Sequence, residues 1–103
     1  MKNDRVLQML SLAQRAGKVA SGEFMTESSV KDGKAFLVVV AADASDNTKK
    51  KFRDMCDFYG VPFLIYGSLD SLGHAIGKEF RASLCVTDAG LAGQIEKKAT
   101  EVV

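Results

Sequence analysis

The sequence predicts an α/β fold, a three-layer α/β/α sandwich in which helices cover both faces of a central sheet. Helical and strand patterns alternate from one end of the chain to the other. Residues 35–42, AFLVVVAA, form a continuous apolar run that is too short for a buried helix and typical of a central strand. Because single helices separate the predicted strands, we expect parallel neighbours joined by right-handed crossovers.

One domain is expected over residues 1–103. A chain of 103 residues is long enough for one hydrophobic core and too short for two independently stable ones. Its composition, 47% hydrophobic and 26% charged with a single Pro, is that of an ordinary globular protein. The sequence has no linker, internal repeat or low-complexity stretch that would divide it.

Two helices and a very short strand are predicted before the apolar run. The first helix ends at Gly17, and residues 19–20 are a candidate strand. Ser21 is predicted to cap the second helix, which extends to Gly33. Glu23 lies in its first turn, where a negative charge favours the positive end of the helix dipole. The apolar face of the first helix consists of Val6, Leu7, Met9, Leu10 and Ala13.

The helix after the apolar run has the clearest pattern in the chain. Asp43 or Ser45 is expected to cap it, and the sequence GVP ends it. Its apolar residues recur at i, i+3, i+4 and i+7, which places one stripe on the core. The residues of this stripe are Phe52, Met55, Cys56 and Tyr59.

The remaining segment contains two predicted strands and two predicted helices. Residues 63–66 and 83–87 are the strands, and the short helix between them ends at Gly77. Asp88 is expected to cap the last helix. The apolar residues of these two helices are Leu69, Leu72 and Ile76, followed by Leu91, Ala92, Ile95 and Ala99.

Composition excludes several classes of protein. No apolar run approaches the roughly 20 residues of a membrane-spanning helix, and the first ten residues lack a signal-peptide pattern. Cys56 and Cys85 are isolated and the chain has one His, so neither a disulfide framework nor a zinc site is supported. We expect a cytoplasmic, monomeric protein with two buried thiols, no membrane partner, no metal and no other cofactor.

Patterns of catalytic residues are absent from the sequence. His74 has no carboxylate or Cys partner at helical spacing, and the serines lack a nucleophile elbow. Residues 73–79, GHAIGKE, contain two glycines and a lysine but fail as a phosphate loop. Glu79 stands where Ser or Thr would bind magnesium, and a helix rather than a strand precedes Gly77. We therefore expect a protein that is not an enzyme.

Basic residues are concentrated in the N-terminal half of the chain, although the net charge is only +1. Residues 1–53 carry ten Lys and Arg against six Asp and Glu, whereas residues 54–103 carry four against seven. This asymmetry allows a nucleic-acid partner without requiring one. The lysines of residues 48–53, TKKKFR, point in three directions on a helix, so we interpret this run as a solvated face. One or two of them could still steer an RNA backbone.

Two further segments carry features of a binding surface. Residues 21–26, SGEFMT, place a glycine and free backbone N–H groups at a helix start, a geometry suited to phosphates or to acceptor edges of bases. Residues 77–85, GKEFRASLC, hold Phe80 between charged residues just before a predicted strand.

Five motifs resemble, in order and spacing, the family of kink-turn RNA-binding ribosomal proteins. They are RAGKVASGE, GKAFLVVVAADAS, VPF, LGHAIGKEFR and VTDAG. The family includes the L-seven-Ae and L-thirty-e types and a bacterial YlxQ-like branch. The resemblance covers nearly the whole chain and implies a four-stranded mixed sheet between helices. It also implies a role in translation or transcription as a ribonucleoprotein component, with structured, kink-turn-like RNA, ribosomal RNA and the ribosome as candidate partners.

The resemblance also implies where RNA binds. In the family, the start of the second helix enters the groove at sheared G·A pairs, and the loop after the fourth helix covers an extruded nucleotide. Residues 22–28 and 78–82 match these segments. Phe80 would cover the unstacked base while Lys and Arg meet phosphates. The candidate RNA-binding residues are Lys18, Ser21, Gly22, Glu23, Phe24, Glu27, Ser28, Asp43, Lys78, Glu79, Phe80, Arg81 and Ala82.

The start of the second helix departs from the family pattern. Strong kink-turn binders carry an amide followed by Glu, with Lys one turn later, whereas this chain has Phe24, Met25 and Ser28. The change removes a phosphate contact and an acceptor for a guanine edge. Three carboxylates lie nearby as substitutes: Glu23, Glu27 and Asp43. The alternative function is a protein-interaction module on the ribosome or transcription machinery that keeps the fold, with weak or no kink-turn binding.

Overall fold

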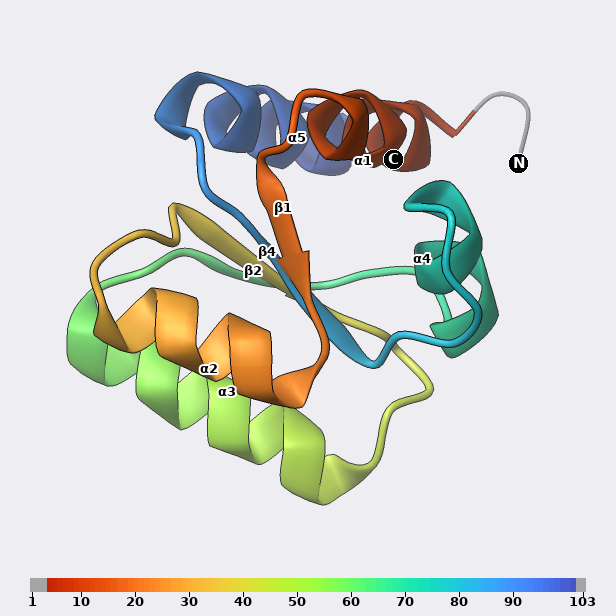
Figure 1. The fold of residues 1–103 in the computed structure, drawn as a ribbon. Helices are drawn as coiled ribbons and strands as arrows, with labels where there is room; N and C mark the ends of the chain where they lie inside the picture. The colour runs from red at the N-terminus through yellow and green to blue at the C-terminus, as the bar shows by residue number, and fades with distance from the viewer. Residues whose placement is uncertain (1–3, 102–103) are drawn as a thin grey trace.

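Five helices and four strands alternate within residues 4–101, the part of the chain that the computed structural model describes. In chain order they are α1 (Arg5–Arg15), β1 (Val19–Ser21), α2 (Glu23–Lys31), β2 (Leu37–Val40), α3 (Asp46–Tyr59), β3 (Phe63–Ile65), α4 (Leu69–Ala75), β4 (Ser83–Val86) and α5 (Ala89–Glu101). Helices α1 and α5 pack together on one face of the sheet, and α2 and α3 cover the other (Figure 1). The predicted three-layer α/β fold is confirmed.

The sheet is mixed, with the strand order β1-β4-β2-β3. Strands β2 and β3 are parallel, with Val38 opposite Phe63. Strand β4 is antiparallel to both of its neighbours, so that Val86 lies opposite Val19 on one side and Leu37 on the other. The mixed sheet is confirmed, whereas the expectation of parallel neighbours from the helix–strand alternation is wrong for β4.

The position of α4 explains why β4 runs in the opposite direction. Helices α2 and α3 lie side by side on the same face of the sheet and each carries the chain back along it, so β1, β2 and β3 run the same way. Helix α4 has only 7 residues and stays at the end of the sheet where β3 finishes (Figure 1). The carboxyl ends of β1, β2 and β3 therefore meet the amino end of β4.

The start of α2 differs from the predicted cap. The prediction that Ser21 caps this helix is wrong, because Ser21 is the last residue of β1 and pairs with Leu84. Gly22 is the N-cap instead, and it offers no side-chain acceptor. Its φ of 91° lies in a region that glycine adopts without the strain of a Cβ.

The caps of α3 and α5 follow the sequence signals. Of the two candidate caps of α3, the structure selects Ser45, whose Oγ accepts a hydrogen bond from the Thr48 N–H at 3.1 Å. Asp88 accepts a hydrogen bond from the Leu91 N–H at 2.9 Å, as expected for a residue that caps the last helix.

The core lies on both faces of the two central strands, β2 and β4, which are completely buried. Cys56 and Cys85 are buried free thiols, as predicted. Burial raises the pKa of the Cys56 thiol to about 11 and also raises the pKa of Cys85, so both stay protonated at neutral pH. The placement of Tyr59 on the core stripe is wrong. The ring is 44% exposed beside a shallow hollow, because the helix ends there and the chain turns at Gly60.

Membrane crossing has no candidate element in the described part of the chain. None of the helices within residues 4–101 combines the length and the apolar character that a span requires.

Candidate nucleic-acid interface

One end of the sheet brings together segments that are far apart in the sequence. The Gly22 N–H donates to the Ser83 carbonyl at 2.9 Å and joins the start of α2 to the start of β4. The Ala41 N–H donates to the Ala82 carbonyl, also at 2.9 Å, and joins the end of β2 to the same strand. We call the surface formed here by residues 21–28, 43 and 78–82 the candidate interface. It contains the two main segments that the resemblance implied.

Arg81 connects these two segments directly. Its Nε donates a hydrogen bond to the Ser21 Oγ at 3.1 Å, and its Nη1 donates to the Phe80 carbonyl at 2.8 Å. Its backbone N–H donates to the Leu69 carbonyl at 3.0 Å, which holds the loop against the first turn of α4. The side chain is half-buried, so the guanidinium is positioned by the protein and still reaches the surface, where its remaining N–H groups suit a phosphate.

The backbone path of residues 78–82 depends on Gly73 of α4. A Cβ at this position would collide with the Glu79 carbonyl oxygen, so the loop crosses the helix where only glycine leaves room. The Gly73 carbonyl also accepts a hydrogen bond from the Lys78 N–H at 2.8 Å. This path leaves Lys78 and Glu79 exposed and Phe80 63% exposed. Phe80 is thus exposed on a loop whose backbone is held in place by contacts with α4.

The start of α2 presents apolar side chains beside its free backbone N–H groups. The first N–H groups of an α-helix have no intrahelical acceptor, and Gly22 provides no side-chain cap for them here. Phe24 is 76% exposed, and Met25 next to it is exposed as well. Ser28, one turn further along, is half-buried. The exposed Phe24 and Met25 are better suited to stacking against the faces of bases than to hydrogen bonding with base edges.

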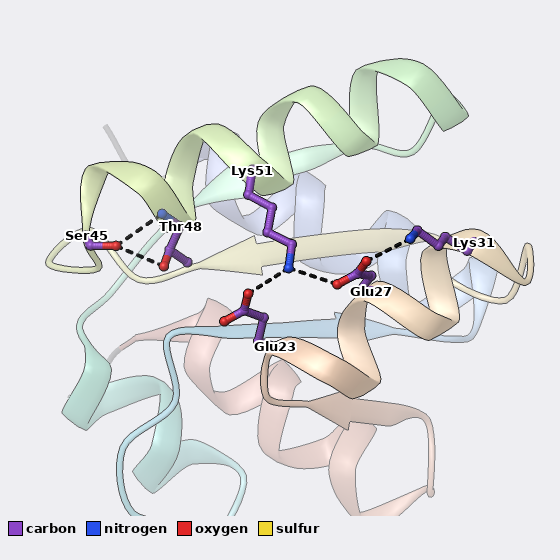
Figure 2. A network of polar contacts seen from close by, with 6 residues as sticks. All are labelled: Glu23, Glu27, Lys31, Ser45, Thr48 and Lys51. Carbon is purple, nitrogen blue, oxygen red and sulfur yellow. Dashed lines mark hydrogen bonds and ion pairs between the residues drawn. The ribbon is translucent and has the colours of Figure 1, made fainter.

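Glu23 and Glu27 face α3 and are held in ion pairs (Figure 2). The Lys51 Nζ lies 2.6 Å from Glu23 Oε2 and 2.8 Å from Glu27 Oε1. The Lys31 Nζ lies 2.8 Å from the second carboxylate oxygen of Glu27. Hydrogen bonds from Lys31 and Lys51 lower the pKa of Glu27 to about 2, and the same ion pairs raise the pKa of both lysines. Both carboxylates therefore already accept from lysine donors.

Asp43 holds α4 in place at the edge of the candidate interface. Its Oδ1 accepts a hydrogen bond from the Leu69 N–H at 2.7 Å, at the start of that helix. The sequence allowed Asp43 as a cap of α3. In the structure it accepts a hydrogen bond from the first residue of α4 instead.

Lys18 lies apart from the other candidate residues. It precedes β1, whereas Ser21 ends that strand, and a strand of three residues spans about 10 Å. The Lys18 carbonyl accepts a hydrogen bond from the Thr87 N–H at 2.8 Å, beyond the far end of β4. The structure brings the loop of residues 78–82, Asp43 and the start of α2 to one end of the sheet, whereas Glu27 and Ser28 lie further along α2 and Lys18 lies at the other end of β1.

Lys51 is the residue of this region that reasoning from the sequence missed. The TKKKFR run indicated a solvated face, and Lys50 fits that interpretation because it pairs with Asp54 one turn away at 2.7 Å. Lys51 instead reaches across to α2. A signal was present in the sequence, since Glu23 and Glu27 are like charges one helical turn apart and such a pair is destabilising without a cation nearby.

A second group of exposed aromatic rings lies at the other end of α2 and α3. Phe58 is 80% exposed, and its ring meets that of Tyr59 edge to face with centroids 4.9 Å apart. Phe36 and Tyr59 line a shallow hollow there. Neither this group nor any other part of residues 4–101 contains three or more His, Cys, Asp or Glu side chains that could hold a metal ion.

Two bacterial proteins named for RNA binding are similar to this chain over most of its length. The RNA-binding protein YlxQ of Bacillus subtilis (strain 168) is 44% identical over 87 residues, which cover 84% of this chain and 87% of that protein. The RNA-binding protein YlxQ of Enterococcus faecium is 37% identical over 99 residues, which cover 96% of this chain and 91% of that protein.

Solved structures share the fold. A protein of unknown function from Bacillus halodurans aligns with a TM-score of 0.92 at 35% identity, covering 95% of this chain and 99% of that one. The 15.5kD RNA-binding protein of Giardia lamblia aligns with a TM-score of 0.78 at 25% identity, covering 94% and 86%. Residues 4–95 match the ribosomal protein L7Ae/L30e/S12e/Gadd45 family. The chain therefore belongs to this family, as the resemblance of its motifs indicated.

Proposed function

We propose that this protein binds structured RNA of the kink-turn type through the candidate interface. The observation that carries the proposal is the hydrogen bond between Arg81 and Ser21, which joins the loop that carries the exposed Phe80 to the residue just before the open start of α2. Sharply bent RNA presents base edges and an unstacked base at the same place, and these two segments are suited to them. The names of both YlxQ proteins and of the Giardia lamblia protein support an RNA ligand.

Each part of the candidate interface has a distinct role in this proposal. Phe80 covers an unstacked base, and such stacking contributes roughly 1–3 kcal/mol per base, which explains an exposed aromatic ring in a loop. Arg81 and Lys78 contact phosphates and set the orientation of the RNA. The first N–H groups of α2 donate to phosphates or to acceptor atoms of bases.

The composition of the α2 start sets the preference among RNAs. Phe24 and Met25 offer no hydrogen bond to a guanine edge, and Ser28 carries no charge for a phosphate. Glu23 and Glu27 are occupied by lysine donors. We therefore propose modest affinity for a standard kink-turn and higher affinity for an RNA that offers a further unstacked base to Phe24.

The cellular setting that we propose is the ribosome or its immediate machinery. The family to which the chain belongs is named for ribosomal proteins, and ribosomal RNA is the corresponding candidate ligand. A role in translation, or in transcription linked to it, follows from that setting.

Titration of labelled RNA hairpins that contain kink-turns, at low and moderate salt, tests the proposed function. We expect the wild-type protein to bind. The substitutions Phe80→Ala and Arg81→Ala should each weaken binding by about tenfold or more, as loss of a stacked base or of a charged contact predicts. Phe58→Ala is the matched control, because Phe58 is also highly exposed but lies at the other end of α3. Absence of binding to every structured RNA tested, or binding that neither substitution changes, would overturn the proposal.

Exposure of Phe24 and Met25 favours a second candidate function, a protein-interaction module. Adjacent exposed apolar side chains at a helix start are suited to a hydrophobic protein contact as well as to bases. Pull-down from a nuclease-treated lysate separates the two functions. Partners that remain bound without RNA, and are lost with Phe24→Ala, would favour the protein contact.

A further inference from the structure

Two carboxylates occupy a position where a nucleic acid would normally be repelled. Glu23 and Glu27 lie in the first two turns of α2, inside the candidate interface and one helical turn apart. Unpaired, they would repel each other and any phosphate that approached the helix start. Approach of a phosphate to the N–H groups of this segment is therefore favoured when their charge is compensated.

Lys51 removes that charge from a different helix. Its Nζ contacts Glu23 Oε2 at 2.6 Å and Glu27 Oε1 at 2.8 Å, and so bridges the two carboxylates (Figure 2). Lys31 pairs only with Glu27, at 2.8 Å, and from the side away from Glu23. Without Lys51, Glu23 would lose its ion pair and the pair of carboxylates would keep a net negative charge.

The position of Lys51 in α3 distinguishes it from its neighbours. Lys50 pairs with Asp54 on the same helix, and Lys31 pairs with Glu27 on the same helix. Among the ion pairs within residues 4–101, those of Lys51 join two helices. The side chain of Lys51 is also less exposed than that of Lys50, 36% against 74%, which indicates that the α2–α3 contact positions it.

We propose that Lys51 is a positioning residue for RNA binding, which makes the start of α2 compatible with phosphates by completing, with Lys31, the neutralisation of Glu23 and Glu27 and by drawing them toward α3. The inference rests on the proposed function and adds a residue outside both segments of the candidate interface. Lys51 acts through the two glutamates, and the surface that remains for the RNA consists of the α2 N–H groups, Phe24 and Met25.

Three variants of the full chain test this role with the same kink-turn hairpins. Lys51→Met removes the charge and keeps the aliphatic stem. Lys50→Met removes one lysine charge from the adjacent position of the same helix and is the matched control. The double variant Lys51→Met and Glu23→Gln removes the lysine together with one glutamate charge, and it leaves the Glu27–Lys31 pair, so that the local charge equals that of the wild type. Thermal unfolding of each variant checks that the fold is kept, as expected for side chains at the surface.

Binding is measured at several salt concentrations, because repulsion between exposed charges is screened within about 10 Å at 0.1 M salt. We expect Lys51→Met to weaken binding by about fivefold to tenfold at low salt and less at moderate salt. The affinity of Lys50→Met should stay within about twofold of the wild type, because Lys50 pairs with Asp54 of α3 and not with a residue of α2. The double variant should recover to within about twofold of the wild type, because its local charge is the same.

Four results would overturn the inference, and the last of them would also remove the proposed function. If Lys51→Met and Lys50→Met weaken binding equally, Lys51 contributes only to general attraction. If the double variant does not recover, Lys51 contacts the RNA itself rather than acting through the glutamates. Wild-type binding that Lys51→Met leaves unchanged refutes the inference alone. Wild-type protein that binds none of the RNAs refutes the proposed function and this inference with it.

Discussion

The two segments of the candidate interface are held in place by different kinds of contact. The loop of residues 78–82 is fixed by its backbone, which crosses Gly73 and hydrogen-bonds to α4 and β2. The start of α2 is also joined to β4 by the Gly22–Ser83 backbone hydrogen bond, but its exposed carboxylates are held by side-chain ion pairs with Lys51. The first kind of contact depends on shape and is indifferent to salt, whereas the second depends on charge. One half of the surface is therefore rigid, and the other is adjustable by pH, salt and single charge changes.

The largest expected effect is on the rigid half. In Gly73→Ala, the new Cβ would collide with the Glu79 carbonyl, so the loop must shift away from α4. We expect a loss of about 2–4 kcal/mol in the free energy of unfolding, measured by urea denaturation, together with loss of RNA binding. Gly93→Ala in α5 is the control, because its Cβ would have open space, and it should stabilise the protein by up to about 1 kcal/mol. Equal effects of the two substitutions would show that the loop does not depend on Gly73.

A gain of function is expected from the adjustable half. The combined substitutions Phe24→Asn, Met25→Glu and Ser28→Lys introduce the polar residues that strong kink-turn binders carry at these positions. New hydrogen bonds to charged groups contribute about 1.5–3 kcal/mol, so affinity for a standard kink-turn should rise by about tenfold or more. The gain should vanish when the sheared G·A pairs of the RNA are replaced by Watson–Crick pairs. An equal gain for both RNAs would mean that the added residues attract RNA without reading it.

The hydrogen bond between Arg81 and Ser21, which joins the two segments, is expected to have a moderate effect on the free energy of unfolding. A double-mutant cycle with Arg81→Met and Ser21→Ala should give a coupling of about 1 kcal/mol in the free energy of unfolding, because the hydrogen bond at 3.1 Å is partly buried. A control cycle pairs Ser21→Ala with Arg53→Met, whose side chain lies over Phe63 instead, and should be additive. A coupling energy of similar size in both cycles would contradict a direct interaction between Arg81 and Ser21.

The smallest expected effect is a pH dependence confined to the adjustable half. The pKa of Glu27 is lowered from 4.5 to about 2 by Lys31 and Lys51, so its folded state binds fewer protons than its unfolded state. Its stabilising contribution should be complete above about pH 5 and should be lost as the pH falls toward 2. Urea denaturation of the wild type and Glu27→Gln should therefore give a stability difference that is larger at pH 7 than at pH 3. A stability difference that is the same at pH 7 and pH 3 would contradict the pairing of Glu27 with Lys31 and Lys51.

The sequence predicted the layers of the fold because each element carries its own local signal. The apolar run around β2 and the stripe that contains Phe52 and Cys56 both reach the core. The direction of β4 carries no such signal, since it depends on where α4 lies and not on the composition of either element. Ser21 was a plausible cap by type, but pairing with β4 extends β1 through it and moves the cap to Gly22.

The sequence predicts those features of the candidate interface that depend on residues close together in the chain. The motif GHAIGKEFR contains both the glycine that admits the loop and the phenylalanine that the loop exposes. The ion pair of Lys51 with Glu23 joins residues 28 positions apart on two helices, and no local pattern encodes which lysine of a run will face α2. Lys18 and Ser21 are close in sequence, but β1 separates them in space.

The most direct test of the central claim is an NMR titration of ¹⁵N-labelled protein with a kink-turn RNA. If both segments form one RNA-binding surface, the backbone signals of residues 21–28 and 78–82 should shift together and saturate at the same RNA concentration. The signals around Phe36, Phe58 and Tyr59, at the other end of α2 and α3, should stay in place. Shifts centred on those aromatic residues, or shifts in only one of the two segments, would contradict the account.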